Sequence, residues 1–253
     1  MDLTDSPLAH RVVASPNFGE RHHFTAPECL ILHYTGMPTG AAALQRLCDP
    51  NAEVSCHYLI WEDGRIDQLA PEAKRAWHAG KSQWGDITDL NSASIGIEIV
   101  SAGHVAVHGV ETPPAFPPAQ IKAVIALCKD ICTRHHIAPA RVLAHSDIAP
   151  GRKIDPGELF PWAELAAHGV GHYVQPAPLK EGNLIAKGSI GPPVSALQSL
   201  LRDYGYSIEI NGVYDDKCAT VVAAFQRHFR PARVDGVADV STVLTLRELS
   251  AKH

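Results

Sequence analysis

Short apolar runs alternate with helical repeats along the first 170 residues of the chain. The runs at 29–32, 95–100 and 142–144 are bounded by polar residues, which is typical of buried strands. Residues 119–135 repeat apolar side chains at helical spacing, and residues 41–47 have helix-forming composition. Interleaved strands and helices predict an α/β (α+β) domain in which helices flank a central mixed sheet.

Three further segments refine this prediction. Residues 54–61 are rich in β-branched and aromatic side chains, and an Asp-Gly pair separates them from the alternating segment 65–69, so we predict a hairpin. In the run 95–100 the odd positions are all isoleucine, which places Gly96 and Glu98 on the opposite face of that strand. The Pro-rich segment 112–118 predicts a loop that ends where the long helix begins.

The pattern changes near residue 174. Proline and glycine cluster over 174–191, which indicates a linker. Beyond this cluster, helical periodicity returns over 194–204, 219–229 and 242–249. We therefore expect a small C-terminal three-helix domain, and we divide the chain into residues 1–175, a linker at 176–190, and residues 191–253.

Composition indicates a folded protein and argues against some classes of function. The 253 residues are 45% hydrophobic and 19% charged, which is enough apolar content for a buried core. The net charge is −5 and no dense Lys/Arg tract occurs, which argues against a general nucleic-acid binder. No apolar run approaches the ~20 residues that cross a bilayer, and the sequence implies no protein partner.

Cysteine usage and the first residues favour the cytoplasm. The six cysteines are scattered without a CxxC pair, as expected for reduced core residues. Cys128 and Cys132 are four residues apart on the long predicted helix and could bind a metal, but the apolar stripe there favours core packing. Residues 1–20 do not resemble a secretory signal. The alternative is a periplasmic or outer-membrane location, if a leader has been removed.

Three candidate metal ligands lie at or just beyond the ends of predicted strands. His33 and His145 each follow an apolar run, and Asp155 comes ten residues after His145. Two imidazoles and one carboxylate form a three-ligand set for zinc, which leaves the fourth tetrahedral position to water. The chain has fifteen histidines, so spacing alone does not establish such a site.

The residues around these candidates carry a stronger signal. Five segments occur in order: LHYT at 32–35, HYLI at 57–60, RAWHAG at 75–80, SIGIE at 94–98 and AHSDIAPGRKIDPG at 144–157. Together they resemble the type-2 N-acetylmuramoyl-L-alanine amidases, the AmpD- and AmiD-like family related to the peptidoglycan recognition proteins. The resemblance covers about residues 15–172, and the segment at 144–157 is its most specific part.

The resemblance implies roles for five polar residues. It implies that the ligands of one Zn²⁺ ion are His33, His145 and Asp155. It also implies that Glu98 is the general base and that Lys153 is the cation beside the developing oxyanion. Structural alternatives stay open for the last two. Glu98 could be a buried acid paired with Arg65 or Arg75, and Lys153 could be a solvated loop residue.

Further residues resemble positions near the substrate cleft of the family. They are Tyr34, His57, Trp77, His78 and Arg152. For His57 and His78, core packing or support behind the metal ligands is an equal alternative. Trp77 would either stack on a sugar or pack against the protein.

The C-terminal region resembles the three-helix peptidoglycan-binding domain over about residues 181–250. The matching segments are LQ at 197–198, GY at 205–206, NGVY at 211–214, FQ at 225–226 and DG at 235–236. Each also has a structural explanation, because leucine and phenylalanine build a core while Asn-Gly and Asp-Gly pairs form turns. The resemblance therefore implies the fold more firmly than any contact with a glycan.

The sequence thus predicts a hydrolase of the amide bond between the lactyl group of N-acetylmuramoyl, or 1,6-anhydro-N-acetylmuramoyl, and L-alanine of the stem peptide. The expected substrate is a muropeptide or peptidoglycan, in recycling or turnover. One alternative is a recognition protein of the same fold that binds the wall without cutting it. Another is a zinc D,D- or L,D-peptidase, against which the lack of an HExxH motif argues.

Overall fold

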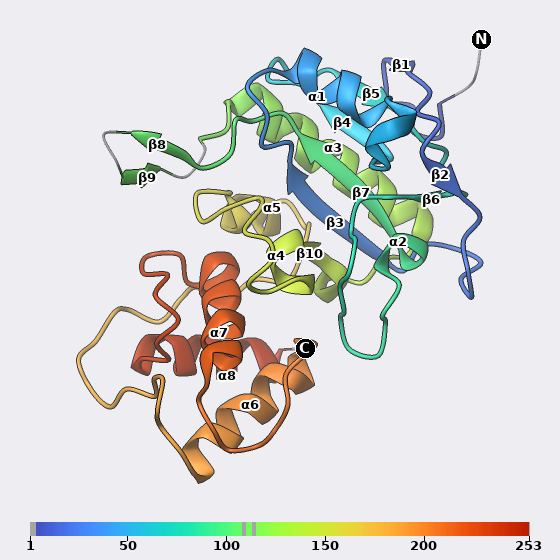
Figure 1. Ribbon diagram of the computed structural model, residues 1–253. Helices are drawn as coiled ribbons and strands as arrows, with labels where there is room; N and C mark the ends of the chain where they lie inside the picture. The colour runs from blue at the N-terminus through green and yellow to red at the C-terminus, as the bar shows by residue number, and fades with distance from the viewer. Residues whose placement is uncertain (1–3, 108–109, 113–114, 253) are drawn as a thin grey trace.

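The computed structural model describes residues 4–107, 110–112 and 115–252, and its N-terminal part is built on one mixed sheet (Figure 1). The strand order is β1-β5-β4-β7-β3-β10. In that order the strands span Arg11–Val12, Ile66–Gln68, Tyr58–Ile60, Ser94–Ile99, Cys29–Tyr34 and Val142–Ala144. Strands β4, β7, β3 and β10 run parallel, whereas β5 is antiparallel to β4. The predicted fold class is confirmed.

Helix α3, Pro118–His135, covers one face of this sheet. The three isoleucines of β7 pack in one buried cluster with side chains of α3 such as Ile121 and Ile131. Cys128 is completely buried in the same cluster, so its predicted core packing is confirmed. Because side chains alternate along a strand, Gly96 and Glu98 lie on the face of β7 that α3 does not cover.

Short elements fill the connections between these strands. Helices α1, α2, α4 and α5 span Gly40–Leu47, Leu90–Ala93, His145–Ile148 and Trp162–Ala167. Two-stranded sheets join β2, Phe18–Gly19, to β6, Arg75–Ala76, and β8, Val105–Val107, to β9, Val110–Thr112. The β8–β9 pair was not predicted, and residues 113 and 114 of the Pro-rich segment lie outside the described residues.

The predicted hairpin is confirmed in β4 and β5, although its first strand is shorter than the pattern at 54–61 suggests. The reason is that Val54 and Ser55 bond to other segments. The Ser55 N–H donates to the carbonyl oxygen of Trp77, and the Asn17 amide donates to the carbonyl oxygen of Val54. The backbone therefore joins the sheet from His57 onward, where the His57 N–H donates to the carbonyl oxygen of Gly96 in β7.

Three helices form the C-terminal region, as predicted. They are α6, Pro192–Tyr204; α7, Asp216–Phe229; and α8, Val240–Ala251. Asp215 and Asp239 cap α7 and α8 by accepting from backbone N–H groups three residues on, at 2.8 and 2.7 Å. None of the described helices is long and apolar enough to span a lipid bilayer.

The two glutamine motifs of this region stabilise its turns. Gln198 Oε1 accepts from both N–H groups of the Asn-Gly turn at 211–212, at 3.1 and 2.9 Å. Gln226 Oε1 accepts in the same way from the Asp-Gly turn at 235–236, also at 3.1 and 2.9 Å. A helix thus holds a turn in each case, which gives the LQ/NG and FQ/DG pairs a structural function.

Candidate metal centre and active site

Three side chains converge at the carboxyl ends of β3 and β10. His33 lies near the end of β3, and His145 directly follows β10 as the first residue of α4. The Nδ1 atoms of these histidines are 2.9 Å apart, and Asp155 Oδ2 lies 3.1 and 3.0 Å from them. All three side chains are buried, and their ligand atoms lie within 4.8 Å of one another, so the group could hold a metal ion.

The contacts of His145 leave a lone pair on its Nδ1 atom. Its other ring nitrogen, Nε2, lies 3.1 Å from the carbonyl oxygen of Ala79, which can only accept a hydrogen bond. Arg152 Nη2 lies farther from Nε2, at 3.4 Å, and donates instead to the same carbonyl oxygen at 2.6 Å. Nε2 therefore carries the proton of the neutral ring. Nδ1, which faces His33 and Asp155, is then free to bind a cation.

A longer chain of hydrogen bonds fixes the tautomer of His33. The Ser94 hydroxyl donates to the carbonyl oxygen of Leu90, so it accepts from His78 Nε2, 3.2 Å away. His78 Nδ1 is then unprotonated and accepts from His33 Nε2 at 3.0 Å. The lone pair of His33 is thus left on Nδ1, next to that of His145.

Burial and charge favour a neutral imidazole at His33 and an ionised carboxylate at Asp155. Burial, followed by the neighbouring His145, lowers the pKa of His33 to about 4. Burial alone would raise the pKa of Asp155, but His145 and His33 lower it well below its ordinary value. Two imidazole nitrogens and one carboxylate oxygen are ligands that zinc prefers, so the residues present fit the predicted metal.

Asn91, which was not predicted, fixes the two residues that contact His33 and His145 from behind. Its Oδ1 atom accepts from the backbone N–H groups of His78 and Ala79, at 2.9 and 2.7 Å. These two residues contact the outer nitrogens of His33 and His145. Asn91 lies in α2, and no motif marks it, because its contacts form across an irregular loop.

Glu98 lies beside His33 on the neighbouring strand. The two residues are paired in the register of β3 and β7. Arg65 and Arg75, the alternative partners of Glu98, each form an ion pair with an aspartate instead. Glu98 Oε2 is buried and makes no hydrogen bond to any described residue.

The surroundings of Glu98 make it a strong proton acceptor. Burial, and then the charge of Asp155, raises the pKa of Glu98 well above its ordinary value, while Lys153 acts in the opposite direction. A general base works best when its pKa approaches the operating pH. Glu98 also lines the cavity over the metal centre, so its carboxylate can reach a substrate there.

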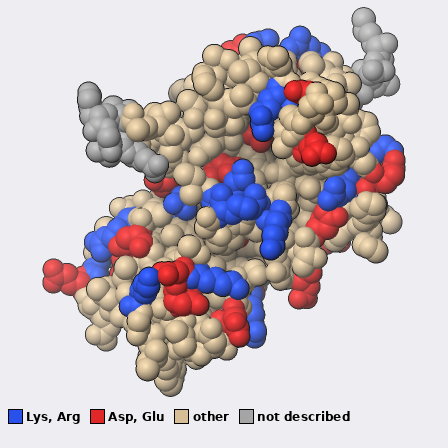
Figure 2. All heavy atoms as spheres, in the orientation of Figure 1, with Lys and Arg blue, Asp and Glu red and all other residues tan. Residues whose placement is uncertain are grey.

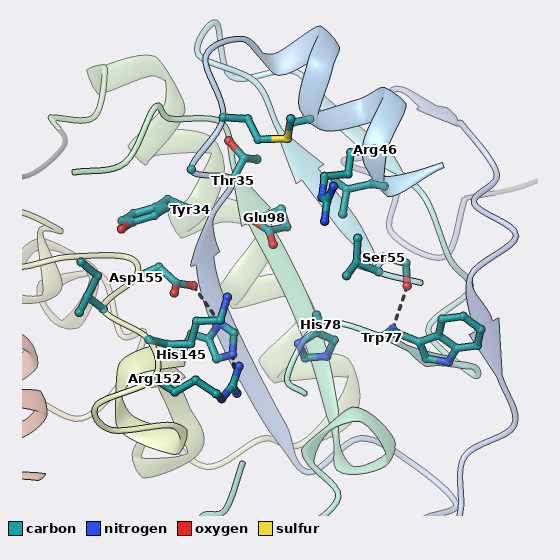
Figure 3. A pocket seen from close by; sticks show the side chains of 17 residues that line it. Tyr34, Thr35, Arg46, Ser55, Trp77, His78, Glu98, His145, Arg152 and Asp155 are labelled. Carbon is teal, nitrogen blue, oxygen red and sulfur yellow. Dashed lines mark hydrogen bonds and ion pairs between the residues drawn. The ribbon is translucent and has the colours of Figure 1, made fainter. Parts of the chain in front are cut away.

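A cavity of about 390 Å³ opens over these groups (Figure 3). Four of the five predicted substrate residues line it: Tyr34, Trp77, His78 and Arg152. Lys153 lines it as well, together with Arg46 of α1, which was not predicted. The lining therefore carries three basic side chains beside the carboxyl groups of Glu98 and Asp155. Figure 2 shows basic side chains gathered near the centre of this face of the molecule.

Two lining residues are held in position by their own hydrogen bonds. Arg152 Nη2 donates to the carbonyl oxygen of Ala79 at 2.6 Å, and its Nε donates to that of Lys81 at 3.1 Å. The Tyr34 hydroxyl lies 3.1 Å from Nδ1 of His104. A substrate therefore meets side chains whose conformations are largely set before it binds.

His57 lies beneath the cavity and is not among the residues that line it. Its side chain is completely buried, with Nδ1 accepting from the Gly96 N–H at 2.9 Å and Nε2 donating to the carbonyl oxygen of Lys74 at 3.0 Å. Its ring makes an edge contact with His78. This geometry gives His57 a supporting position behind His78 and does not favour direct contact with substrate.

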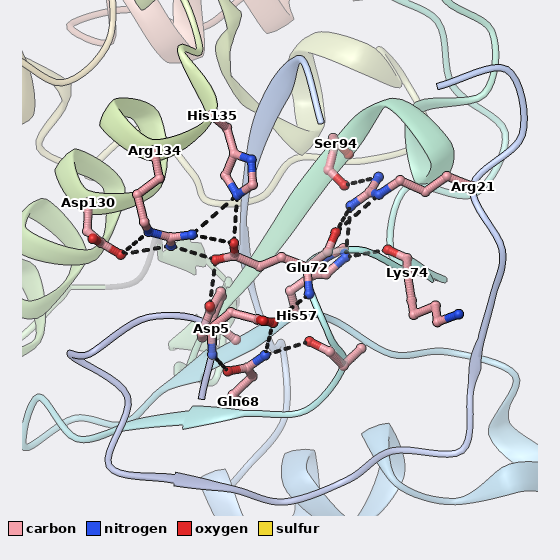
Figure 4. Close-up of polar contacts among 12 residues, drawn as sticks. Asp5, Arg21, His57, Gln68, Glu72, Lys74, Ser94, Asp130, Arg134 and His135 are labelled. Carbon is pink, nitrogen blue, oxygen red and sulfur yellow. Dashed lines mark hydrogen bonds and ion pairs between the residues drawn. The ribbon is translucent and has the colours of Figure 1, made fainter. Parts of the chain in front are cut away.

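A buried ionic network continues from His57 (Figure 4). The Glu72 carboxylate accepts from Arg134, His135 and the Tyr58 hydroxyl, at 2.6 to 2.7 Å. Burial alone would raise the pKa of Glu72, but these bonds, with Arg134 first, lower it to about 2. The network is thus a structural ion cluster that ties α3 to the sheet.

We expect the metal-free protein to lose stability on mild acidification because His57 stays neutral when folded. Burial, and then the charge of Arg21, lowers the pKa of His57 to about 3, against about 6.5 in the unfolded chain. Between these values the unfolded chain binds a proton that the folded one does not. The loss reaches about 1.4 kcal/mol per pH unit for this group.

Urea unfolding of the metal-free protein between pH 7.5 and 5 measures this effect. The variant His57→Gln, which can keep both hydrogen bonds, should show a shallower decline over that range. Glu72 contributes separately, because its stabilisation is present above about pH 4.5 and is lost only toward pH 2. An equal decline in the variant and the parent would contradict this assignment.

Family models match both parts of the chain. The model of the N-acetylmuramoyl-L-alanine amidases matches residues 23–158, which is more than half of the chain. A model of a peptidoglycan binding domain matches residues 190–246.

Curated relatives agree with these matches. The chain is 41% identical over 233 residues to N-acetylmuramoyl-L-alanine amidase AmiD of Escherichia coli K12, covering 88% of this chain and 82% of the relative. It is 34% identical over 174 residues to the 1,6-anhydro-N-acetylmuramyl-L-alanine amidase AmpD of Citrobacter freundii, covering 62% of this chain and 88% of the relative.

Solved structures extend the agreement to 94% of this chain. AmiD from E. coli, in complex with the substrate anhydro-N-acetylmuramic acid-L-Ala-D-γ-Glu-L-Lys, superposes with a TM-score of 0.78 at 37% identity, covering 94% of this chain and 98% of that one. AmpDh3 from Pseudomonas aeruginosa, in complex with an anhydromuramic pentapeptide, gives a TM-score of 0.73 at 33% identity, with 94% of each chain covered. The chain therefore belongs to the N-acetylmuramoyl-L-alanine amidase family and carries a peptidoglycan-binding domain.

Proposed function

We propose that this chain is a zinc-dependent hydrolase of the amide bond between the lactyl group of N-acetylmuramoyl, or 1,6-anhydro-N-acetylmuramoyl, and L-alanine of the stem peptide. The observation that carries this proposal is the convergence of two imidazole lone pairs and one carboxylate beside Glu98, whose Oε2 has no hydrogen-bond partner among the described residues. The solved relatives with bound anhydromuramyl peptides support the substrate class.

The ligands and the base have separate roles in this mechanism. His33, His145 and Asp155 would hold the zinc ion, which when bound makes water more acidic and polarises a carbonyl group. Glu98 takes a proton from the water that attacks the lactyl carbonyl carbon. It then delivers that proton to the nitrogen of L-alanine as the C–N bond breaks.

The cations of the cavity complete the proposed site. Lys153, two residues before Asp155, supplies a positive charge beside the oxygen that becomes negative, an effect worth about 3 kcal/mol per donor in comparable sites. Arg152, fixed on two backbone carbonyls, would bind a carboxylate of the stem peptide. Tyr34, Trp77 and His78 would form the walls of the binding site.

The domain division and the compartment belong to the same proposal. We assign catalysis to residues 1–175 and wall binding to residues 191–253, joined by 176–190. All six cysteines are free thiols, which supports the cytoplasm and the recycling of anhydromuropeptides. The peptidoglycan-binding domain supports the envelope instead, and turnover on soluble anhydromuropeptides compared with intact sacculi separates the two.

Removal of the metal is expected to abolish cleavage. After dialysis against a zinc chelator, the protein should release no stem peptide from a soluble anhydromuramyl tripeptide, because no group remains to activate water at neutral pH. One equivalent of Zn²⁺ per chain should restore the release. Mass spectrometry of the products identifies the bond that is cut.

Three results would contradict the proposal. Undiminished cleavage by the metal-free protein would exclude zinc dependence. A zinc-loaded protein that binds the muropeptide but leaves it intact would be a recognition protein. Products cut within the stem peptide, with the lactyl amide intact, would identify a peptidase.

A further inference from the structure

A buried carboxylate next to the metal centre depends on the C-terminal domain. Asp147 is completely buried and lies two residues beyond the ligand His145. Its Oδ1 accepts from the hydroxyl of Tyr206 at 2.7 Å, and its Oδ2 accepts from His228 Nδ1 at 2.6 Å. Tyr206 follows α6 and His228 lies in α7, so both donors come from the helical domain.

Asp147 in turn holds the segment that carries two of the three ligands. Its Oδ2 accepts from the Ala144 N–H at 2.8 Å, which fixes the first turn of α4, where His145 is the first residue. The Ser146 N–H then donates to the carbonyl oxygen of Asp155 at 3.1 Å. A shift of Asp147 would therefore move His145 and Asp155 together.

The two donors are themselves held rigidly. The His228 ring is stacked between Trp162, at 3.7 Å between ring centroids, and Phe229, at 3.8 Å. Tyr206 makes an edge contact with Trp84 at 4.9 Å. Burial, and then the charge of Asp147, raises the pKa of Tyr206 well above its ordinary value, so its hydroxyl stays a donor.

The two domains are tightly packed against each other at Gly205. The Gly85 N–H donates to the carbonyl oxygen of Gly205 at 2.7 Å. Gly205 has a φ of +137°, and a Cβ atom there would lie 2.6 Å from Cζ2 of Trp84. Only glycine fits so close a contact between the two domains.

Apolar packing is also continuous across the joint. One buried cluster contains Ile148 and Trp84 of the N-terminal part together with Leu201, Tyr206 and Phe225 of the helical part. Figure 1 shows α7 beside α4 at this boundary. A module that only tethers the enzyme to the wall needs no such contact, because a flexible linker would suffice.

We propose that the C-terminal helical domain is a structural part of the metal centre, in which Tyr206 and His228 act as positioning residues that hold Asp147 and thereby set His145 and Asp155 for zinc. This role is distinct from capture of the wall. The activity readout below rests on the proposed amidase function, whereas the zinc-affinity readout does not.

The test compares two variants that each remove one buried tyrosine hydroxyl. Tyr206→Phe removes the donor to Asp147. Tyr214→Phe is the matched control, because Tyr214 is a residue as buried as Tyr206 and its hydroxyl donates at 2.7 Å to the carbonyl oxygen of Gly236, within the helical domain. Zinc affinity is measured on each full chain by competition with a chromophoric chelator, and thermal unfolding of the metal-free protein reports stability.

We expect Tyr206→Phe to bind zinc about tenfold more weakly than the parent. Losses of this size are typical when a residue that orients a metal ligand through hydrogen bonds is removed. Its kcat on a soluble anhydromuramyl tripeptide should fall while KM stays unchanged. Tyr214→Phe should show a similar thermal shift but the zinc affinity of the parent. Parent-like zinc binding by Tyr206→Phe, or equal weakening in both variants, would overturn the proposal.

A second pair of variants tests the other donor. In His228→Asn the amide nitrogen can occupy the place of Nδ1, whereas His228→Leu offers no donor. Zinc affinity should be closer to that of the parent in the asparagine variant, and equal affinities in the two variants would count against the proposal. If the parent binds zinc tightly but releases no stem peptide, the proposed substrate fails while these affinity comparisons remain valid.

Discussion

Replacement of Glu98 by glutamine is expected to lower kcat for cleavage of the lactyl amide by about 10³-fold with zinc still bound. The substitution keeps the size of the side chain but removes the group that accepts the water proton. No described residue donates a hydrogen bond to Glu98 Oε2, so replacing this oxygen by an amide nitrogen breaks no hydrogen bond there. Folding and metal binding should therefore be nearly unaffected.

The measurement combines steady-state kinetics on a soluble anhydromuramyl tripeptide with the zinc content of the same sample. Glu62→Gln is a suitable control, since Glu62 is exposed near the hairpin turn between β4 and β5. A Glu98→Gln protein that keeps more than about a tenth of the parental kcat would show that Glu98 is not the base, given the roughly 10²–10⁴-fold typical of such catalysis. Loss of zinc together with activity would assign it a structural role.

Gly96→Ala is expected to disrupt the proposed metal centre by displacing the ring of His78. A Cβ atom at this position would lie 2.6 Å from Cδ2 and Nδ1 of His78, closer than van der Waals contact allows. The ring is already fixed between His33 and Ser94, so it must shift and release the N–H of His33. We expect zinc affinity to fall at least about tenfold and the free energy of unfolding to fall by about 1–3 kcal/mol.

Chelator competition and urea unfolding measure these two effects. Gly19→Ala is the matched control, because Gly19 is also a strand glycine and a Cβ atom added there would meet nothing within 4 Å beyond its immediate chain neighbours. Truncating the ring in the double variant Gly96→Ala/His78→Ala should recover stability relative to Gly96→Ala alone. If zinc affinity in Gly96→Ala equals that in Gly19→Ala, the ring of His78 is not the support described above.

Much of the fold could be predicted because burial leaves a periodic trace in sequence. The isoleucines of β7 and the apolar stripe of α3 repeat with the periods of a strand and a helix, and they pack against each other. The proposed metal ligands could not be found in this way. A histidine at a strand end has the same local pattern whether or not it binds a metal, so the motif at 144–157 was needed to single out His145 and Asp155.

Other features had no local signal. Asn91 acts through its side-chain oxygen on the backbone of His78 and Ala79, and an asparagine in a short helix has no sequence pattern that announces such a contact. The periodicity of α6 and α7 predicts which side is buried but not which partner buries it. The contacts of Tyr206 and His228 with Asp147 therefore emerged only from the three-dimensional arrangement.

The pairing of His33 with Glu98 on adjacent strands also bears on how this enzyme can diversify. Their separation follows from the spacing of neighbouring strands, about 4.8 Å, and not from any loop. Arg46, Trp77 and Arg152 of the cavity wall instead come from a peripheral helix and from connecting segments. Substrate preference can therefore be re-engineered by replacing surface segments, while the distance between the proposed ligand His33 and the proposed base Glu98 is preserved by the backbone of the sheet.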